Sequence, residues 1–292
     1  MEFSEGRKKE ENMKKLILMA VFTTIAFGQY NDGNTVVTWS RYKWEPLSKL
    51  EGISLEDRAA DVTEFHTKRN KVARKLLGST MLTHYWSGSV LDVEILGEFK
   101  NMNDATDYAG FNNINQLAWN NPEERAAAVS NYNRHFQAYH EDVHIFENWV
   151  ALEKKRTVEV TGEETFFSGP VVTVSVRYWK RMSDVEGGSA EERLKLMKKV
   201  AKEVVGKNPK ILSQKVLTHL WSGSIEGGAL PVVFLTEYAS IADADDPGNA
   251  EYWEASFSEE EVQNYNKYFH WLIDKHDDLG LFRTFEPAGK NK

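Results

Sequence analysis

The chain has 292 residues, of which 41% are apolar, 27% charged and 12% aromatic, and it contains no Cys. This composition supplies a sizeable hydrophobic core and excludes wholesale disorder, while the missing thiols exclude disulfides, thiolate zinc sites and Cys nucleophiles. A net charge of −8 and an isoelectric point near 5.6 argue against a nucleic-acid partner, which usually meets a basic face.

The first segment with a recognisable pattern resembles a secretory signal peptide. A basic Met-Lys-Lys at 13–15 precedes an apolar run over 16–27 and then Gly28, which is the layout of a segment cleaved on export. The run is shorter than the roughly 20 apolar residues of a membrane span. We therefore expect residues 1–28 to be an N-terminal extension and signal peptide. Cleavage would leave a secreted or periplasmic protein without a membrane span; an uncleaved anchor or a buried helix is the alternative.

The rest of the chain contains one pattern twice. Residues 82–89 read Leu-Thr-His-Tyr-Trp-Ser-Gly-Ser and 217–224 read Leu-Thr-His-Leu-Trp-Ser-Gly-Ser. Arg41-Tyr42 recurs as Arg177-Tyr178. Landmarks repeated in one order at so long a spacing predict two domains rather than a solenoid. We expect this division: a first unit at 34–154, a linker at 155–167, a second unit at 168–286 and a tail at 287–292.

The sequence of each unit predicts the element order β-α-β-β-α-β. Ser54 and Ser189 are candidate N-caps, each with a carboxylate in the following turn. The expected strands are 36–44, 91–99 and 149–153 in the first unit, 171–179, 232–238 and 281–285 in the second, and the Leu-Thr-His segment of each. The expected second helical regions are 103–143 and 251–278. This order is that of the ferredoxin-like, or split βαβ, unit.

A unit of this kind carries helices on one face of its sheet, so the other face needs a cover. Element order, unit length and the internal repeat, marked by Leu-Thr-His-x-Trp-Ser-Gly-Ser, resemble the dimeric α+β barrel family in a tandem form. The resemblance implies an α+β fold in which two ferredoxin-like units pack sheet to sheet within one chain. The family includes cofactor-free monooxygenases, haem-handling enzymes and isomerases, so the resemblance implies fold more strongly than function.

Alternation along the strands selects one Arg, one His and one Glu from each unit as candidate site residues. They are Arg41, His84 and Glu98 in the first unit and Arg177, His219 and Glu237 in the second. If all point between the sheets, they would suit an anionic or enolisable small molecule, with His as proton shuttle and Arg as anion clamp. The alternative is a buried polar network that holds the two sheets together.

Residues 140–144 read His-Glu-Asp-Val-His, which matches the H-E-x-x-H signature of zinc proteases. The second unit has Gly280 at the position equivalent to His144, and this Gly resembles a helix C-cap. His144 would then lie beyond the end of a helix, so we expect no metal site. We also expect no cofactor, because a chain with eight His residues offers many single-His matches for a haem ligand and none is specific.

Two classes of function remain open. The first is a small-molecule binding or transforming protein, whose enzymatic version would be a cofactor-free monooxygenase or isomerase. The second is a non-catalytic structural or interaction domain with no small-molecule site. An open cavity lined by His84 or His219 and an Arg would favour ligand binding, whereas a filled interior would favour the structural role. The sequence patterns indicate neither the oligomeric state nor whether the protein is an enzyme.

Overall fold

The structure is a computed structural model that describes residues 29–31, 35–84, 91–108, 111–153, 170–219, 230–270 and 277–285. The expected signal segment and linker lie outside these residues. Within the described part of the chain, no helix combines the length and the apolar character of a bilayer span.

Both units follow the predicted element order, with the second helix broken into three short helices. The first unit comprises β1 (Gln29–Asn31), β2 (Thr35–Trp44), η1 (Leu47–Lys49), α2 (Leu55–Val72), β3 (Leu76–His84), β4 (Asp92–Phe99), α3 (Met102–Tyr108), α4 (Phe111–Ala118), α5 (Pro122–Asn133) and β5 (Phe136–Glu153). The second comprises β6 (Val171–Trp179), η2 (Met182–Asp184), α7 (Ala190–Lys199), its π-helical continuation η3 (Val200–Val205), β7 (Ile211–His219), β8 (Leu230–Tyr238), α8 (Ile241–Asp245), α9 (Asn249–Ser256), α10 (Glu259–Asn266) and β9 (Asp277–Phe285).

The long helix of each unit begins where the sequence predicts. Ser54 Oγ accepts a hydrogen bond from the backbone N–H of Asp57 at 3.0 Å, and Ser189 Oγ accepts one from Glu192 at 3.0 Å. Each bond satisfies one of the N–H groups that a helix start leaves without an intrahelical partner. The two N-caps are 135 residues apart, which is also the spacing of the Leu-Thr-His segments.

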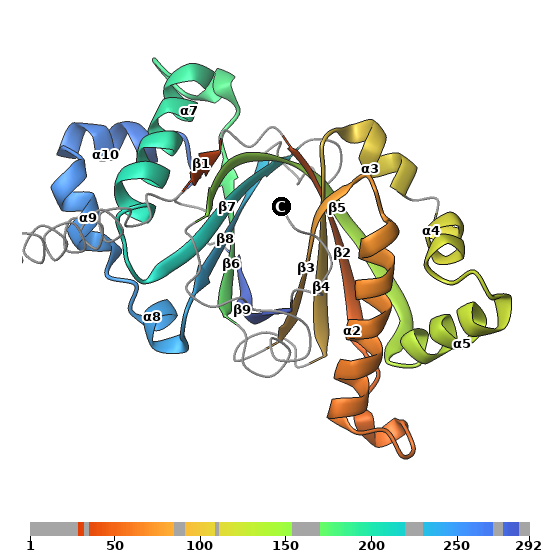
Figure 1. Cartoon of the computed structure of the whole chain (residues 1–292). Coiled ribbons are helices and arrows are strands. Elements are labelled where there is room, and N and C mark those ends of the chain that lie inside the picture. Colours follow the sequence, from red (N-terminus) through yellow and green to blue (C-terminus); the bar gives the residue numbers. More distant parts are fainter. Residues whose placement is uncertain are drawn as a thin grey trace, which may run out of the picture.

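The strands form two antiparallel sheets that join into a closed barrel. Their orders are β5-β2-β4-β3 and β9-β6-β8-β7, and the sheets are hydrogen-bonded to each other through β3–β9 and through β5–β7. Closure leaves neither sheet with an open long edge, which is the usual weakness of β structure. The helices of each unit cover the outer face of its own sheet (Figure 1). This is the architecture of a dimeric α+β barrel, with one chain supplying both halves, and it confirms the predicted fold class.

The two sheets share an apolar core on their inner faces. Nine buried side chains from both units form it: Val37, Trp39, Leu82, Leu96, Val172, Val174, Leu217, Val233 and Leu235. Separate cores lie between each sheet and its own helices, around Phe65 in the first unit and around Met197 in the second. The chain therefore has four layers, namely helices, sheet, sheet and helices, with apolar side chains buried in each gap.

The predicted helices through 143 and 278 are wrong in their final segments, because these residues are strand. β5 begins at Phe136, and it is hydrogen-bonded to β2 on one side and, further along, to β7 on the other. In this strand the Cα atoms of His140 and His144 are about 13 Å apart, against about 6 Å one turn apart on a helix. The H-E-x-x-H run thus lacks the helical geometry of a zinc protease. Gly280 lies within β9 opposite Val174 and is not a helix C-cap.

Candidate functional site

The two predicted arginines lie on opposite faces of the barrel wall. Arg41 points inward, where its Nε donates to Glu94 Oε1 at 2.8 Å. The Arg177 guanidinium lies 5.3 Å from the centre of the Phe234 ring, and Phe234 packs against the outer core of the second unit. The prediction that Arg177 shares the inner face is therefore wrong.

The face of Arg177 is mispredicted because Arg41 is matched to a residue one position too far along the chain. Between β2 and β6 the structural spacing of the units is 135 residues, as Trp44 and Trp179 show at the ends of these strands. At that spacing the position equivalent to Arg41 is Val176, and Arg177 is equivalent to Tyr42. The match of Arg41 to Arg177 uses a spacing of 136, and a shift of one residue moves a side chain to the other face of a strand.

Glu94 is the centre of a buried polar group on the inner face of the first unit. It accepts hydrogen bonds from Arg41 Nε at 2.8 Å and from Trp39 Nε1 at 2.5 Å, and only 1% of the residue is exposed. Burial raises the pKa of Glu94, and the nearby Arg41 charge opposes that rise. The equivalent strand positions in the second unit are all Val: 174, 176 and 233. Sequence reasoning missed Glu94, although it stands directly opposite Arg41.

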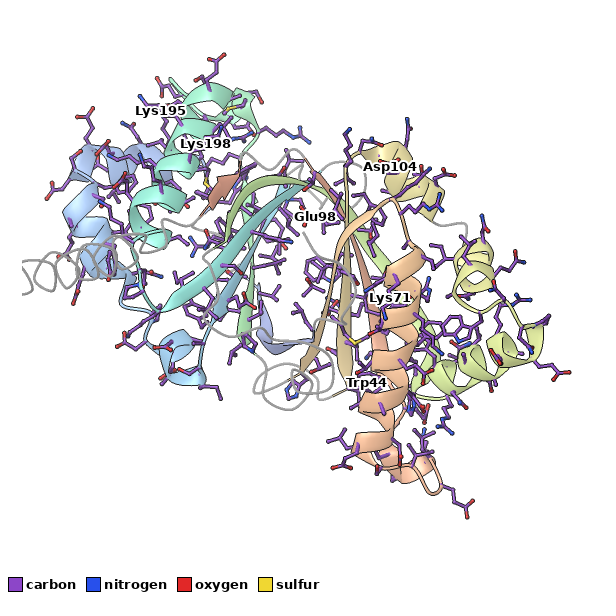
Figure 2. All side chains as sticks on the ribbon, in the orientation of Figure 1. Trp44, Lys71, Glu98, Asp104, Lys195 and Lys198 are labelled. Atoms are coloured by element: carbon purple, nitrogen blue, oxygen red, sulfur yellow. The ribbon has the colours of Figure 1, made fainter. Side chains whose placement is uncertain are left out.

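Glu98 and Glu237 lie on the inner face, at equivalent positions of β4 and β8. Glu98 accepts from Thr35 Oγ1 at 2.6 Å and pairs with Lys215 Nζ of the second unit at 2.8 Å. Glu237 accepts from Ser213 Oγ at 2.7 Å. Figure 2 shows Glu98 between the two sheets, near one end of the barrel. The Glu98–Lys215 pair joins the two units. A polar network that holds the two sheets together is the alternative role given for these residues in the sequence analysis.

The two histidines end equivalent strands. His84 is half-buried and lies opposite Phe282 of β9, and the backbone of His219 lies opposite Phe146 of β5. The side chain of His219 lies outside the described part of the structure. Proton transfer by these histidines therefore stays a prediction. Of the predicted set, Arg41, Glu98 and Glu237 lie on the inner face, but Arg41 and Glu98 are four residues apart along the paired strands β2 and β4.

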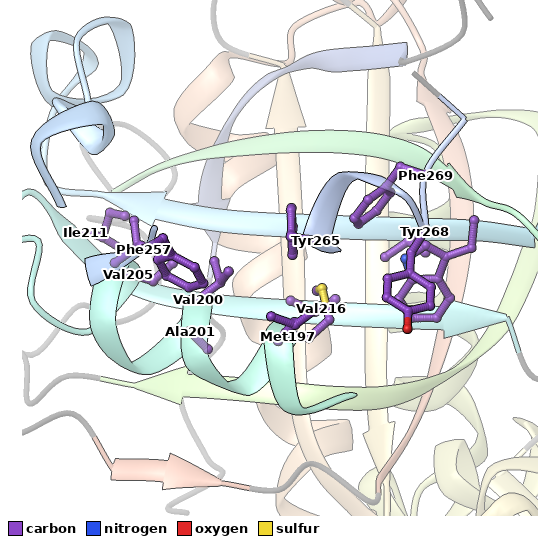
Figure 3. Packing of buried hydrophobic residues seen from close by; sticks show 14 of the residues in the cluster. Met197, Val200, Ala201, Val205, Ile211, Val216, Phe257, Tyr265, Tyr268 and Phe269 are labelled. Atoms are coloured by element: carbon purple, nitrogen blue, oxygen red, sulfur yellow. The ribbon is translucent and has the colours of Figure 1, made fainter. Parts of the chain in front are cut away.

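A pocket of about 720 Å³ lies elsewhere, between the outer face of the second sheet and its helices. Strands β6 and β8 form its floor, and η3, α8, α9 and α10 form its walls. Its lining residues are Thr173, Val174, Ser175, Arg177, Val200, Val204, Val205, Gln214, Phe234, Thr236, Tyr238, Ile241, Ala244, Asp245, Asn249, Trp253 and Tyr265. Figure 3 shows Val200, Val205 and Tyr265 among the neighbouring core residues that pack over this sheet. Arg177 thus reaches a cavity, although a different one from that predicted.

The pocket exists because small side chains replace large ones at equivalent positions. In the first unit, Phe65 occupies this layer and stacks on Tyr132, with ring centres 4.0 Å apart. Arg69 lies over the same Phe65 ring at 5.2 Å. At the spacing of 135, the second unit has Val200 and Val204 in place of Phe65 and Arg69. A position-by-position comparison of the two units in the sequence contains this signal.

The pocket is apolar along η3, where Val200, Val204 and Val205 line it, and its floor carries Thr, Ser and Gln side chains. Gln214 Nε2 donates to Thr236 Oγ1 at 3.0 Å on neighbouring strands. Burial raises the pKa of Tyr265 to about 12, and the nearby positive charge of Arg177 opposes that rise. Burial also raises the pKa of Tyr238. Both phenols are therefore neutral at physiological pH, and each is able to donate a hydrogen bond.

The described lining does not fit a haem group, which the fold family would suggest. A resident haem needs an axial ligand, which is His, Cys, Met or a Tyr phenolate. The described lining holds no His, Cys or Met, and burial raises the pKa of its two tyrosines, Tyr238 and Tyr265, which disfavours the phenolate. Of the candidate histidines, His66 is bonded to Tyr132 at 3.1 Å and His135 to Asp61 at 2.9 Å. Both lie in the first unit, so neither would reach this pocket.

Comparison with known proteins gives remote structural likenesses. A Lactobacillus acidophilus protein provisionally classed as a monooxygenase superposes with a TM-score of 0.46 at 11% identity, covering 87% of this chain and 95% of its own. A mutant chlorite dismutase from Candidatus Nitrospira defluvii gives a TM-score of 0.45 at 11% identity, covering 88% and 93%. An anthrone oxidase-like protein gives 0.39 at 9% identity, covering 90% and 98%. No family model and no curated protein sequence matches the chain.

Proposed function

We propose that this chain is a small-molecule binding protein whose ligand site is the outer pocket of the second unit. Its volume of about 720 Å³ lies within the roughly 300–1,000 Å³ of ligand sites, and apolar walls with a few converging polar groups are their usual composition. The observation that carries the proposal is the difference between the units. The same layer is filled by Phe65 in one unit and left open at Val200 in the other.

The neutral, apolar fluorophore N-phenyl-1-naphthylamine tests this proposal. Fluorescence titration of the wild-type protein should show saturable binding to one site per chain. Val200→Phe restores the side chain of the first unit and should weaken binding at least about tenfold, because the ring fills the space. Leu77→Phe adds the same ring at an exposed position of the first unit, where 43% of the residue is exposed, and should leave binding unchanged. Equal affinities of Val200→Phe and the wild type would contradict the proposal.

We further propose that the protein is exported. The basic start, apolar run and small residue of 13–28 support this proposal. β1 begins at Gln29, so cleavage after Gly28 would leave every described strand in the mature chain. The intact mass and N-terminal sequence of protein recovered from its own host should give a start at Gln29. A chain that retains residues 13–28 would contradict it.

A further inference from the structure

Tyr132 and Tyr265 occupy equivalent places in the two units. Each is the second-last residue of the last helix of its unit, α5 or α10. Each also packs against a Phe four residues later: the ring centres are 4.8 Å apart at Phe136 and 5.1 Å apart at Phe269. In the first unit, the Tyr132 hydroxyl lies 3.1 Å from Nε2 of the buried His66. There the phenol joins α5 to α2.

The second unit has no imidazole to do the same for Tyr265. The spacing of 135 residues holds at the N-caps of the two long helices and at the strands that follow them, which begin at Leu76 and Ile211. At that spacing the position of His66 is taken by Ala201 (Figure 3), whose methyl group cannot bond a phenol. Within the described residues, the Tyr265 hydroxyl makes no hydrogen bond.

Tyr265 nevertheless lies at the wall of the pocket, with only 5% of the residue exposed. Val200 and Val204 belong to the same lining, and the centres of the Trp253 and Tyr265 rings are 5.2 Å apart. None of these neighbouring side chains is a hydrogen-bond acceptor. The phenol is therefore a polar group in apolar surroundings, and an acceptor for its proton would have to come from a molecule in the pocket.

Two other polar groups of the lining already have partners. Gln214 donates to Thr236 at 3.0 Å, and Tyr238 is hydrogen-bonded to Thr173. Tyr265 differs from them, and it acts as a donor, because burial raises its pKa to about 12 and the phenol keeps its proton at physiological pH. A buried O–H group without an acceptor is unfavourable, so a ligand that accepts this hydrogen bond is favoured.

The apolar wall also restricts the kind of acceptor. A carbonyl oxygen accepts a hydrogen bond and has no proton of its own. A ligand hydroxyl would bring a second O–H group beside Val200 and Val204, which cannot bond it. A carbonyl group therefore suits this place better than an alcohol.

Building on the proposed function, we infer that the ligand is an apolar molecule with a carbonyl oxygen, which accepts a hydrogen bond from the Tyr265 hydroxyl. Its apolar body lies along Val200 and Val204. Tyr132, at the equivalent place, has a structural role through His66. The presence of Ala201 in place of that His leaves the second phenol for recognition of the ligand.

Two probes of nearly equal shape test this inference: 2-acetonaphthone, which has a carbonyl group, and 2-isopropenylnaphthalene, in which a methylene group replaces the oxygen. Each displaces N-phenyl-1-naphthylamine from the full chain, once the affinity of that fluorophore is known for each variant. Tyr265→Phe should weaken binding of 2-acetonaphthone about threefold to tenfold, the usual value of one neutral hydrogen bond. Binding of 2-isopropenylnaphthalene should stay unchanged or become tighter, because this probe covers the hydroxyl without bonding it.

Tyr252→Phe is the matched control for binding. It removes a phenol from α9 of the same unit, outside the described lining of the pocket, and should leave both affinities unchanged. Urea unfolding gives a second readout. Tyr132→Phe breaks the bond to the buried His66 and should lower the unfolding midpoint, whereas Tyr265→Phe should leave the midpoint unchanged or raise it.

The outcomes separate the inference from the proposed function. Failure of 2-acetonaphthone to bind, or equal effects of Tyr265→Phe on the two probes, would overturn the carbonyl assignment. Binding of N-phenyl-1-naphthylamine and its weakening by Val200→Phe would still support the pocket. Absence of saturable binding of that fluorophore would instead overturn the proposed function. A midpoint lowered as much by Tyr265→Phe as by Tyr132→Phe would show that the Tyr265 hydroxyl has a structural role, and would overturn the inference.

Discussion

The inner and outer faces of the barrel wall are used differently in the two units. On the inner face, the first unit buries an ion pair, Arg41 with Glu94 at 2.8 Å, where the second unit has Val176 and Val233. On the outer face, the first unit fills the layer under its helices with Phe65, and the second unit leaves a pocket of about 720 Å³. The buried Arg41–Glu94 pair and the open pocket therefore occur in different units and on different faces.

This difference shows that two units with the same element order can have different interiors. Both units keep the same strands, the same N-caps and the same cation–aromatic contact, Arg58 over Trp44 at 4.8 Å and Arg193 over Trp179 at 4.0 Å. Those shared features hold each sheet to its helices. Side-chain size at a few equivalent positions then decides whether the layer between a sheet and its helices is packed or open. Exchanging those side chains between the units should therefore exchange their packing.

The largest effect is expected on the inner face of the first unit. Arg41→Val leaves the buried Glu94 carboxylate without its ion-pair partner, and we expect a loss of about 3–5 kcal/mol in the free energy of unfolding. The double variant Arg41→Val with Glu94→Val removes both charges, as in the second unit, but it also takes the Glu94 acceptor from the buried Trp39 N–H. We expect it to lie about 1–3 kcal/mol below the wild type and above Arg41→Val. Urea unfolding of the three proteins gives these values.

Lys43→Val is the matched control for the ion pair. Lys43 lies on the same strand, but its pair with Asp92 spans 4.0 Å and is partly exposed, so its loss should cost about 0–1 kcal/mol. A double variant as unstable as Arg41→Val alone would show that the first unit depends on its polar group for more than charge pairing, and the interior of the two units would then not be exchangeable.

The second effect concerns the outer layer. Phe65→Val opens the first unit at the position where the second is open, and it removes ring contacts to Tyr132 at 4.0 Å and Trp119 at 5.3 Å. We expect a loss of about 2–4 kcal/mol, because a buried ring leaves a cavity. The reciprocal Val200→Phe fills an existing space and should cost less than about 1 kcal/mol. Similar losses in both variants would contradict the difference in packing.

Much of this fold could be predicted from local patterns. Ser54 and Ser189 fix the helix starts through bonds to residues three positions later, and such bonds are visible in the sequence. The strand that begins at Phe136 could not be predicted in the same way. Its residues are flanked by helical segments and carry His, Glu and Asp, and they form a strand because β2 and β7 lie on either side to receive their backbone hydrogen bonds.

The candidate site was predicted less well, for two physical reasons. The face assignment of Arg177 depended on a spacing of 136 where the structure has 135, and strand faces alternate with every residue. The pocket is defined by Val200 and Val204, ordinary core residues whose small size matters only beside Phe65 and Arg69 of the other unit. The prediction from sequence relied on charged and aromatic side chains. The cavity instead exists because the side chains of Val200 and Val204 are small.

The third effect is a pH dependence carried by the first unit. Burial raises the pKa of Glu94 above its ordinary value of 4.5, so the folded state binds this proton more tightly than the unfolded state. The contribution to stability is therefore complete below pH 4.5 and decreases as the pH rises through the folded pKa. The slope should not exceed about 1.4 kcal/mol per pH unit.

Glu94→Gln tests that dependence, because it removes the titrating group and keeps its size. Between pH 4 and pH 7, the wild type should lose stability relative to Glu94→Gln as the pH rises, measured by urea unfolding at each pH. The equivalent position in the second unit is Val233, which does not titrate, so the effect should not have a counterpart there. Stability curves that run parallel over this range would show that Glu94 titrates in the folded protein as it does in the unfolded chain.

The smallest effect compares the two helix starts. Ser54→Ala should cost about 1 kcal/mol, because the cap bond to Asp57 is lost. In this capping box the Asp57 carboxylate accepts from the Ser54 backbone N–H at 2.8 Å, whereas Glu192 of the second unit pairs with Lys267 at 2.8 Å instead. We therefore expect Ser189→Ala to cost somewhat less. Ser54→Gly and Ser189→Gly should each cost only a few tenths of a kcal/mol, since Gly is tolerated at this position. A larger loss for Ser189→Ala would mean that the contacts of the second unit, and not the capping box, set the stability of a helix start.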